Sequence, residues 1–567
     1  PRVARNGERH MQIRYYLAAS AAALSLATVM AAPAHAQETT SSIRGSVTGD
    51  GAPLAGAEVK IIHTPSGTTA TTTTDSDGNF SAVGLRLGGP FTVEVNASGF
   101  EQSSVTDIFL QAGQPFRVPV ELQSQAVIVV TASSVAAVTP LESGAGTVLS
   151  ARDIAGVSNV NRDIRNLAAR DPRVNLDPTN GGAISIAGQN NRFNRFTVDG
   201  VAFGDPFGLE AGGLVSTRGP VPLDAIGEFS VEVAPVDIQQ GFFQGGALNA
   251  QLKSGSNSFS GLAGFYYGDD SLRGDTARGV VRTGAYESKI YTAQLAGPII
   301  KDKLFFAVTY ERLRDIIPAP ILPGALGITD AQLSNISAIA QSAYNFDTQG
   351  IGGNIPEKDD KLVAKVDWNI ADGHRATFTY IYNKGNVTAG QTGIGALTAT
   401  NPTFSYLSNN YNQGATNHFG IVQFNDQWTD SFSTQLRVSY ADYLRIQQPF
   451  GAASFGEFRT CLDPTSPAPV VNQTVATAAL ACSAGQRQLT FGPDISRQAN
   501  ELDAQSLNIE FQATLQLNNH TLKLIAERRT QDIRNLFAQR VSGAWYFDSI
   551  AGLQARQANE LNFSAPL

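Results

Sequence analysis

The stretch KLVAKVDWNI at Lys361–Ile370 shows the pattern that decides the fold, an alternation of apolar and polar side chains. One face collects Leu362, Ala364, Val366, Trp368 and Ile370, and the other collects Lys361, Lys365, Asp367 and Asn369. A period of two residues predicts a β-strand. Strands of roughly ten residues with one apolar and one wettable face are what an outer-membrane β-barrel requires.

The same pattern recurs in LNIEFQATLQL at Leu507–Leu517, and the connections between such segments alternate in length. Short connections are predicted at Gly297–Lys303, Ala371–Gly373, Thr429–Asp430 and Asn518–Asn519. Long ones are predicted at 268–285, 315–359, 385–414 and 446–502. Bacterial barrels have short periplasmic turns and long extracellular loops. The alternative is a soluble all-β sandwich, which would show alternating strands without this asymmetry.

Composition agrees with a barrel and excludes a bundle of transmembrane helices. The 567 residues are 16% charged, with a mean hydropathy of −0.10. A bundle of transmembrane helices would need apolar runs of about 20 residues. The one long apolar run, Leu17–Ala32, follows Arg14 and precedes Ala34-His35-Ala36. This is the pattern of a secretory signal peptide. We therefore predict cleavage between Ala36 and Gln37.

Translation is expected to begin at Met11, so that residues 1–36 comprise an upstream extension and the signal peptide. These residues carry four Arg and one Glu, so their removal changes the net charge from −8 to −11. An acidic exported chain is a poor partner for nucleic acid. Cys461 and Cys482 fall in one long predicted loop, and export favours a disulfide between them. Two free thiols are the alternative, and two Cys without nearby His are too few for a zinc site.

Residues 37–123 predict a small β-sandwich. Strands are expected at Ser42–Thr48, Ala57–Thr64, Thr68–Thr74, Asn79–Val83, Phe91–Ala97 and Phe116–Leu122. The series IRGSVTGDGAPLAGAEVKI, TTDSDGNFSAVGL and GPFTVEVNASGF resembles the carboxypeptidase regulatory-like domain. The resemblance implies a transthyretin-like, carbohydrate-binding-like fold without peptidase activity. Asp75 and Asp77 could be calcium ligands, but the rest of a calcium loop is missing and a β-turn is the preferred interpretation.

Residues 124–136 read SQAVIVVTASSVA, an apolar β-prone run between small polar residues. An unpaired strand of this kind invites pairing with another chain. The run resembles the TonB box, by which TonB-dependent receptors add a strand to the energy-transducing protein TonB. The matching residues are Val127, Ile128, Val129, Val130 and Thr131. A plain linker strand is the alternative.

Residues 137–255 are Gly-rich, with a helix-like stripe at Arg152–Ala169. The ordered series of a VDG motif, an IGEFSVEVAP run and a GGALNAQLKSG exit resembles the plug domain of TonB-dependent receptors. The VDG residues are Val198, Asp199 and Gly200, and the exit residues are Gly245, Gly246, Asn249, Lys253, Ser254 and Gly255. With the hairpin AGPIIKDKLFF, the series resembles the Oar-like, or OmpA-related, branch. We expect the plug to be held by hydrogen bonds and water rather than by apolar contacts.

Residues 256–567 are expected to form a partial antiparallel transmembrane β-barrel of about nine or ten strands, whereas the family barrel has 22. An open half-barrel would leave two unpaired edges in lipid, so we expect a C-terminally truncated sequence. The overall fold class is mainly β: a sandwich, an α+β plug and an incomplete barrel.

The resemblance implies a TonB-dependent receptor in the outer membrane of a Gram-negative bacterium, with the N-terminal domain in the periplasm. Its partners would be TonB, outer-membrane lipid and an extracellular ligand such as a glycan, peptide or siderophore. The alternative is a surface structural or adhesion protein that transports little. The residues show no G-x-S-x-G elbow or P-loop, and neither an enzymatic activity nor a cofactor is predicted. Charged side chains on the polar face, among them Lys365, Asp367, Arg437 and Glu510, are expected to contact the plug or water.

Overall fold

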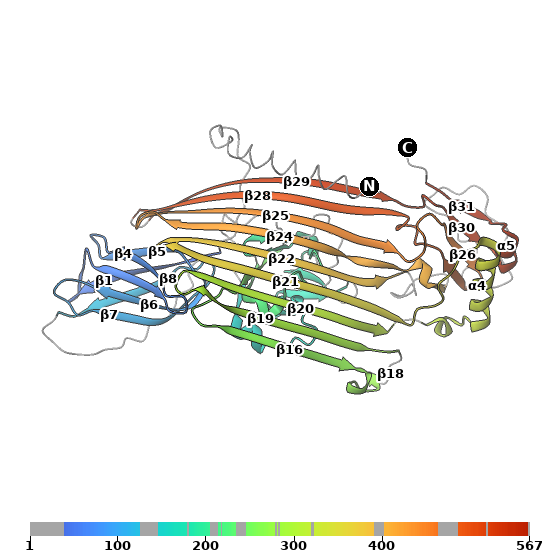
Figure 1. The fold of residues 1–567 in the computed structure, drawn as a ribbon, viewed down its shortest axis with the longest axis horizontal. Helices are drawn as coiled ribbons and strands as arrows, with labels where there is room; N and C mark the ends of the chain where they lie inside the picture. Colours follow the sequence, from blue (N-terminus) through green and yellow to red (C-terminus); the bar gives the residue numbers. More distant parts are fainter. Residues whose placement is uncertain are drawn as a thin grey trace.

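The structure is a computed structural model of the 567-residue chain. It describes residues 39–124, 146–177, 181–203, 214–216, 218–233, 245–277, 280–281, 284–318, 322–390, 402–462, 486–517 and 520–564. These residues are mainly β, as the alternating pattern predicts. No helix among them is both long and apolar enough to cross a bilayer. Figure 1 shows an N-terminal sandwich at one end of a long sheet and a smaller group of strands and helices at the other.

The N-terminal sandwich has two four-stranded sheets. One has the order β2-β1-β5, with β8 parallel to β1, and the other has the order β4-β3-β6-β7. Alternate side chains such as Val59, Ile61 and Val93 fill the core between them. The strands are β1 Ser41–Gly49, β2 Ala52–Pro53, β3 Glu58–His63, β4 Thr68–Thr73, β5 Asn79–Leu85, β6 Gly88–Asn96, β7 Ser103–Leu110 and β8 Phe116–Leu122.

All six strands predicted in this region are present, and the sequence analysis missed β2 and β7. The alternation in β7 is interrupted at Asp107, which adopts a φ of 60° and shifts the buried positions along the strand. The Asp75 turn behaves as the preferred interpretation expects. Its Oδ1 accepts the backbone N–H groups of Asp77 and Asn79 at 2.9 and 2.8 Å.

A five-stranded mixed sheet, here called the inner sheet, follows. Its order is β13-β12-β15-β14-β9, and β12 and β15 run parallel. A separate hairpin of β10 and β11 lies beside two short helices in the chain. The bounds are β9 Gly146–Ser150, α2 Ala151–Gly156, α3 Arg165–Ala168, β10 Val174–Asp177, β11 Ala183–Ile186, β12 Arg195–Val198, β13 Val201–Ala202, β14 Ile226–Val233 and β15 Gly246–Leu252.

The single helix-like segment predicted at 152–169 was wrong, because the structure divides it into α2 and α3. Ser150 and Asp153 form a capping box that begins α2, and the chain becomes extended again at Val157. Arg162 then adopts a φ of 50°, which reverses the chain before α3. The apolar stripe was correct in part, since Ile154, Ile164 and Leu167 are buried, but they belong to two helices and a loop.

The large sheet is antiparallel and has nine strands in the order β16-β19-β20-β21-β22-β24-β25-β28-β29. The bounds are β16 Ser260–Asp269, β19 Glu287–Ile300, β20 Leu304–Pro318, β21 Asn354–Ala371, β22 His374–Ala389, β24 Tyr411–Gln427, β25 Phe432–Pro449, β28 Ala499–Leu517 and β29 His520–Ala538. The strand count and the alternation of short and long connections are those predicted. In β21 the polar face is buried and the apolar face is exposed, with Trp368 50% and Ile370 43% exposed.

Parts of the long connections and the segment after β29 together form a further sheet, here called the loop sheet. Five strands run in the order β23-β27-β26-β30-β31, and helices α4 and α5 accompany them. Aromatic side chains including Phe346, Phe458 and Phe491 form a buried core there. The bounds are α4 Asp330–Tyr344, β23 Thr403–Ser405, β26 Glu457–Cys461, β27 Gln488–Phe491, β30 Ala544–Phe547, α5 Ile550–Ala555 and β31 Glu560–Asn562. Figure 1 places this group at the opposite end of the large sheet from the N-terminal sandwich.

Candidate functional site

The contact between the inner sheet and the buried face of the large sheet is the candidate functional site. It includes the VDG turn, in which Val198 ends β12 and Asp199 and Gly200 both adopt positive φ, 44° and 77°. This left-handed turn directs the chain back into β13. Asp tolerates such a conformation better than most residues, and Gly adopts it without steric cost.

Asp199 connects three parts of the chain. Its Oδ1 accepts the backbone N–H of Leu252 at 2.8 Å, which ties the turn to the end of β15. Its Oδ2 lies 3.1 Å from Nζ of Lys365 on β21 and accepts the Thr379 hydroxyl on β22 at 3.3 Å. One carboxylate therefore fixes the turn both to its own sheet and to the large sheet.

Gly200 makes a second contact with the large sheet. Its carbonyl oxygen accepts a hydrogen bond from Nη1 of Arg437 at 3.3 Å. A Cβ at Gly200 would lie 2.6 Å from that guanidinium, so a side chain there would displace Arg437 as well as strain the left-handed turn. Arg437 is 1% exposed and pairs with Glu510 at 3.2 Å. The expectation that Lys365 and Arg437 would contact the plug-like sheet is confirmed.

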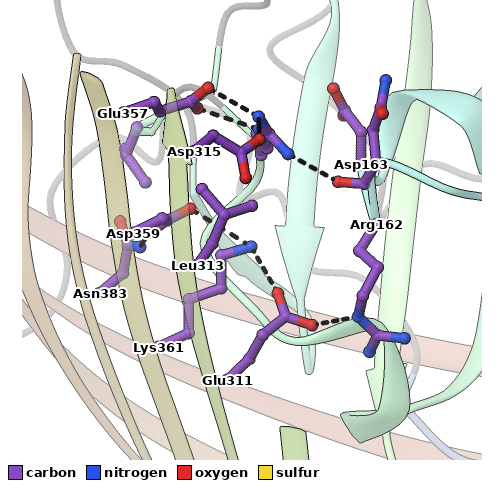
Figure 2. A network of polar contacts seen from close by, with 12 residues as sticks. Arg162, Asp163, Glu311, Leu313, Asp315, Glu357, Asp359, Lys361 and Asn383 are labelled. Atoms are coloured by element: carbon purple, nitrogen blue, oxygen red, sulfur yellow. Dashed lines mark hydrogen bonds and ion pairs between the residues drawn. The ribbon is translucent and has the colours of Figure 1, made fainter. Parts of the chain in front are cut away.

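A second polar contact, shown in Figure 2, joins the loop after α2 to β20 and β21. Nε of Arg162 lies 2.6 Å from Glu311, and its Nη2 lies 2.7 Å from Asp224. Lys361 pairs with the other oxygen of Glu311 at 3.1 Å and with Asp359 at 3.4 Å. The buried Glu311 carboxylate of β20 is thus shared between Arg162, from the loop after α2, and Lys361 of β21.

Arg218, in the segment between β13 and β14, also forms ion pairs with the large sheet. Its guanidinium lies 2.5 Å from Asp315 and 2.7 Å from Glu357. Burial acts to lower the pKa of Arg218, but the carboxylates of Glu357 and Asp315 outweigh it and raise the pKa. Burial and the carboxylates of Glu311 and Asp224 act in the same way on Arg162, whose pKa is also raised. Both arginines remain charged, so these contacts are ion pairs.

The same interface also contains apolar contacts, which corrects the expectation of a purely polar one. Phe203 stacks on Phe419 of β24 with ring centroids 3.7 Å apart. One buried cluster unites inner-sheet residues such as Phe229 with Val363 and Ile381 of the large sheet. The prediction failed because apolar residues interrupt the polar face of the strands at mid-length, where single positions carry little weight in a periodicity argument.

The residues of the exit motif have structural roles inside the inner sheet and at its end. Asn249 is 2% exposed; it accepts the Thr197 hydroxyl at 2.9 Å and donates to Ser230 and Glu232. Gly246 opens β15 beside Glu232, and a Cβ at Gly245 would lie 2.4 Å from Asn194.

Beyond β15 the motif leads into the large sheet. Lys253 donates its backbone N–H to Ala225, and Ser254 hydrogen-bonds to Asp367. A Cβ at Gly255 would lie 2.5 Å from the carbonyl oxygen of Phe306, so the chain passes β20 at a distance that excludes any side chain. In this structure the exit motif therefore lets the chain pass close to β20 and ties β15 to its neighbouring strands.

Several predicted sites fall outside the described residues: Ala36, Gln37, Val127, Ile128, Val129, Val130, Thr131 and Cys482. No cysteine is free among the described residues, where Cys461 ends β26. The disulfide, the cleavage site and the TonB box stay predictions, as do the domain boundaries at 36, 123, 136 and 255.

The sequence analysis missed a third contact, between the N-terminal sandwich and the short-turn end of the large sheet. Arg86 is buried, donates to Asn369 at 2.8 Å and lies 3.6 Å from Asp367. Thr73 donates to Asp430 in the β24–β25 turn at 3.0 Å. Asp367 and Asn369 lie on the polar face that the alternation marks, but Arg86 and Thr73, in a loop and at a strand end, carry no periodic signal.

The sandwich also reaches the inner sheet. The backbone N–H of Ala112 donates to Oε1 of Glu228 on β14 at 3.1 Å. Burial raises the pKa of Glu228 to about 7, the hydrogen bond from Ala112 opposes the rise, and Glu232 adds to it. The contact therefore includes a carboxyl group that changes charge near neutral pH.

Two comparisons with known proteins find similar sequences. Residues 42–123 match the family model described as the carboxypeptidase regulatory-like domain. Over 255 residues the chain is 28% identical to the TonB-dependent transporter Oar of Myxococcus xanthus, covering 42% of this chain and 23% of that protein. The aligned part thus spans less than a quarter of that relative.

Similar solved structures include outer-membrane transporters of which the chain covers about half. The outer membrane transporter YddB from Escherichia coli is 11% identical, with a TM-score of 0.47, and the match covers 72% of this chain and 50% of YddB. A mutant of the ferric enterobactin receptor PfeA from Pseudomonas aeruginosa is 15% identical, with a TM-score of 0.42, covering 68% and 49%.

Proposed function

We propose a function for this chain from its family, since it is an Oar-like relative of the TonB-dependent transporters and carries a carboxypeptidase regulatory-like domain. The proposed function is import of an extracellular ligand across the outer membrane with energy supplied through TonB. The nine-stranded sheet would lie in the lipid with its apolar face outward, and the N-terminal sandwich would lie in the periplasm. The ligand is not converted chemically.

The proposed mechanism has three steps. A ligand binds at the end of the molecule that carries the long connections and the loop sheet. Binding shifts the equilibrium toward states in which the segment Val127–Thr131 is accessible from the periplasm. TonB adds this segment to its own sheet as a strand and transmits force to the inner sheet, which opens a path along the polar face of the large sheet.

The observation that carries the proposal is the set of discrete polar contacts between the two sheets. Each contact joins a residue in a turn or loop beside the inner sheet to one strand of the large sheet. The pairs are Asp199–Lys365, Gly200–Arg437, Arg162–Glu311 and Arg218–Glu357. Water can replace such contacts one at a time once the interface begins to open, because each is a local charge-assisted bond. Displacing the inner sheet also separates the apolar contact of Phe203 with Phe419, while the large sheet keeps its backbone hydrogen bonds.

The test is the interaction with TonB. Val129→Pro should abolish binding of the full-length chain to the purified periplasmic domain of TonB, because proline removes a donor from the added strand. Ala136→Pro, in the linker beyond the predicted box, is the matched control and should bind as the wild type does. Equal binding by both variants would refute the assignment of the TonB box.

A surface adhesion protein is the second candidate, and the loop sheet favours it. That sheet has its own buried aromatic core, and Tyr406, 1% exposed, anchors it by donating to the Leu333 carbonyl at 2.6 Å. A folded surface of this kind suits a large partner such as a glycan or a peptide. Ligand binding that does not depend on TonB, with no uptake, would identify adhesion as the main activity.

A further inference from the structure

A cavity of about 810 Å³ lies between the N-terminal sandwich and the short-turn end of the large sheet. It adjoins the contact between the inner and large sheets, because Arg86 and Arg375 also line a neighbouring pocket that reaches Asp199 and Lys365. Both parts contribute basic side chains to its lining: Arg44, Arg86 and Arg117 from the sandwich, and Arg375 and Lys523 from β22 and β29. Hydroxyl and amide side chains such as Thr434 and Gln512 complete the wall.

The charge of this lining is strongly unbalanced. Among the described residues that line the cavity, Asp426 is the one carboxylate, and its Oδ1 lies 2.8 Å from Nδ1 of His374. Asp367 lies just outside the lining and approaches Arg86 at 3.6 Å. The lining therefore holds five basic side chains and one carboxylate, which already contacts a histidine.

Two of the arginines have buried nitrogens without a hydrogen-bond acceptor among the described residues. Arg86 is 7% exposed; its Nη1 reaches Asp367 only at 3.6 Å, and its Nε lacks an acceptor. Nε of Arg375 lacks one as well. Buried guanidinium nitrogens are costly to leave unpaired, and two like charges add to that cost.

The neighbouring histidine reports the same local positive potential. His63 lines the cavity, and its Nδ1 lies 2.6 Å from the Ser66 hydroxyl. Burial, together with the positive charges of Arg86 and Arg375, lowers the pKa of His63 to about 3 against the opposing effect of Asp367. The site therefore disfavours a further cation.

We propose that this cavity binds a small, multiply charged oxyanion of the phosphate class, which bridges the N-terminal sandwich and the large sheet. Guanidinium groups offer paired N–H donors that match phosphate oxygens, and an anion here would supply the missing acceptors. The proposal goes beyond ligand import, because this anion would bind between the N-terminal sandwich and the large sheet and strengthen their association. The phosphate group could belong to a free anion or to the headgroup of a lipid.

Calorimetric titration of the full-length chain in detergent with pyrophosphate, against sodium chloride of equal ionic strength, tests the proposal. Arg375→Gln should weaken binding at least about tenfold. Arg117→Gln should weaken it as well, and this exposed side chain can be replaced without disturbing a core. Arg534→Gln, an exposed arginine of β29 outside the cavity, is the matched control and should bind as the wild type does.

A second titration with a short-chain phosphatidylglycerol separates the two sources. Binding of pyrophosphate that Arg117→Gln weakens supports a free anion, and binding of the lipid alone with the same sensitivity supports a headgroup. The proposal is overturned if neither probe binds at millimolar concentration. It is also overturned if Arg117→Gln and Arg534→Gln bind equally well.

Discussion

Nζ of Lys365, on the wall of the large sheet, lies 3.1 Å from the carboxylate of Asp199, in the VDG turn of the inner sheet. The same ammonium group donates to the Leu252 carbonyl at 3.1 Å, so it contacts both the turn after β12 and the end of β15. Both side chains are nearly buried, with 11% and 8% exposed. A single ion pair therefore joins the VDG motif of the plug-like region to the large sheet.

Asp199→Asn should destabilise the inner sheet by about 3 kcal/mol, because it leaves Lys365 buried without its carboxylate. Asparagine tolerates the left-handed turn, so the effect isolates the charge. Hydrogen exchange of the amides in β12 and β15 measures it. Lys358→Gln, an exposed position on the same strand β21, should change the exchange free energy by less than about 0.5 kcal/mol. Equal protection in Asp199→Asn and the wild type would contradict the assigned role.

Arg218 and Glu357 should show a coupling energy of about 1–3 kcal/mol in a double-mutant cycle. The two groups are bonded through two nitrogen–oxygen contacts of 3.0 and 2.7 Å, so each single change to Gln leaves a buried charge behind. Urea unfolding of the four proteins, followed by a probe on the inner sheet, gives the four free energies. Simple additivity would show that the pair does not hold the two sheets together.

Gly255→Ala should impair assembly of the sheet, because its Cβ would lie 2.5 Å from the Phe306 carbonyl and 2.9 Å from the Gly297 carbonyl. Backbone atoms cannot move aside as a flexible side chain can, and we expect a cost of about 1–3 kcal/mol. The yield of heat-modifiable, folded protein in the membrane measures the effect. Gly420→Ala is the control, since a Cβ there meets open space, and a normal yield for both variants would refute the claim.

Because of Glu228, the free energy of unfolding should fall as the pH rises from about 4.5 to about 7. Burial raises its pKa from 4.5 to about 7, so the folded state binds a proton there that the unfolded state has released. The cost is fully present above pH 7 and amounts to at most about 3 kcal/mol. Glu228→Gln should remove this dependence when unfolding is measured across the range, and Glu121→Gln, at an exposed position, should not. An unchanged pH profile for Glu228→Gln would contradict the prediction.

The sequence predicted the large sheet well because its determinants are periodic. The alternation around Lys361–Ile370 recurs along whole strands, and the difference between short and long connections is visible over hundreds of residues. Errors arose where single residues decide. Asp107 shifts the pattern of β7, and Arg162 divides a predicted helix through one backbone conformation.

The site was predictable as a motif but not as a set of contacts. The VDG and exit motifs mark the right segments, and the polar face of the wall suggested Lys365 and Arg437 as partners. The sequence could not pair Arg162 with Glu311, because 149 residues separate them and several acidic residues on neighbouring strands were equivalent candidates. The stacking of Phe203 on Phe419 and the contact of Arg86 with Asn369 depend likewise on three-dimensional placement.

The most direct test of the central claim, that the large sheet spans the outer membrane with its long connections outside, is cysteine labelling in intact Gram-negative cells. Ser342→Cys lies on the exposed face of α4, in a long connection, and Lys301→Cys lies in the short turn between β19 and β20. The account predicts that a membrane-impermeant maleimide labels Ser342→Cys in intact cells and labels Lys301→Cys only after the outer membrane is opened. Labelling of Lys301→Cys in intact cells, with Ser342→Cys protected, would contradict it.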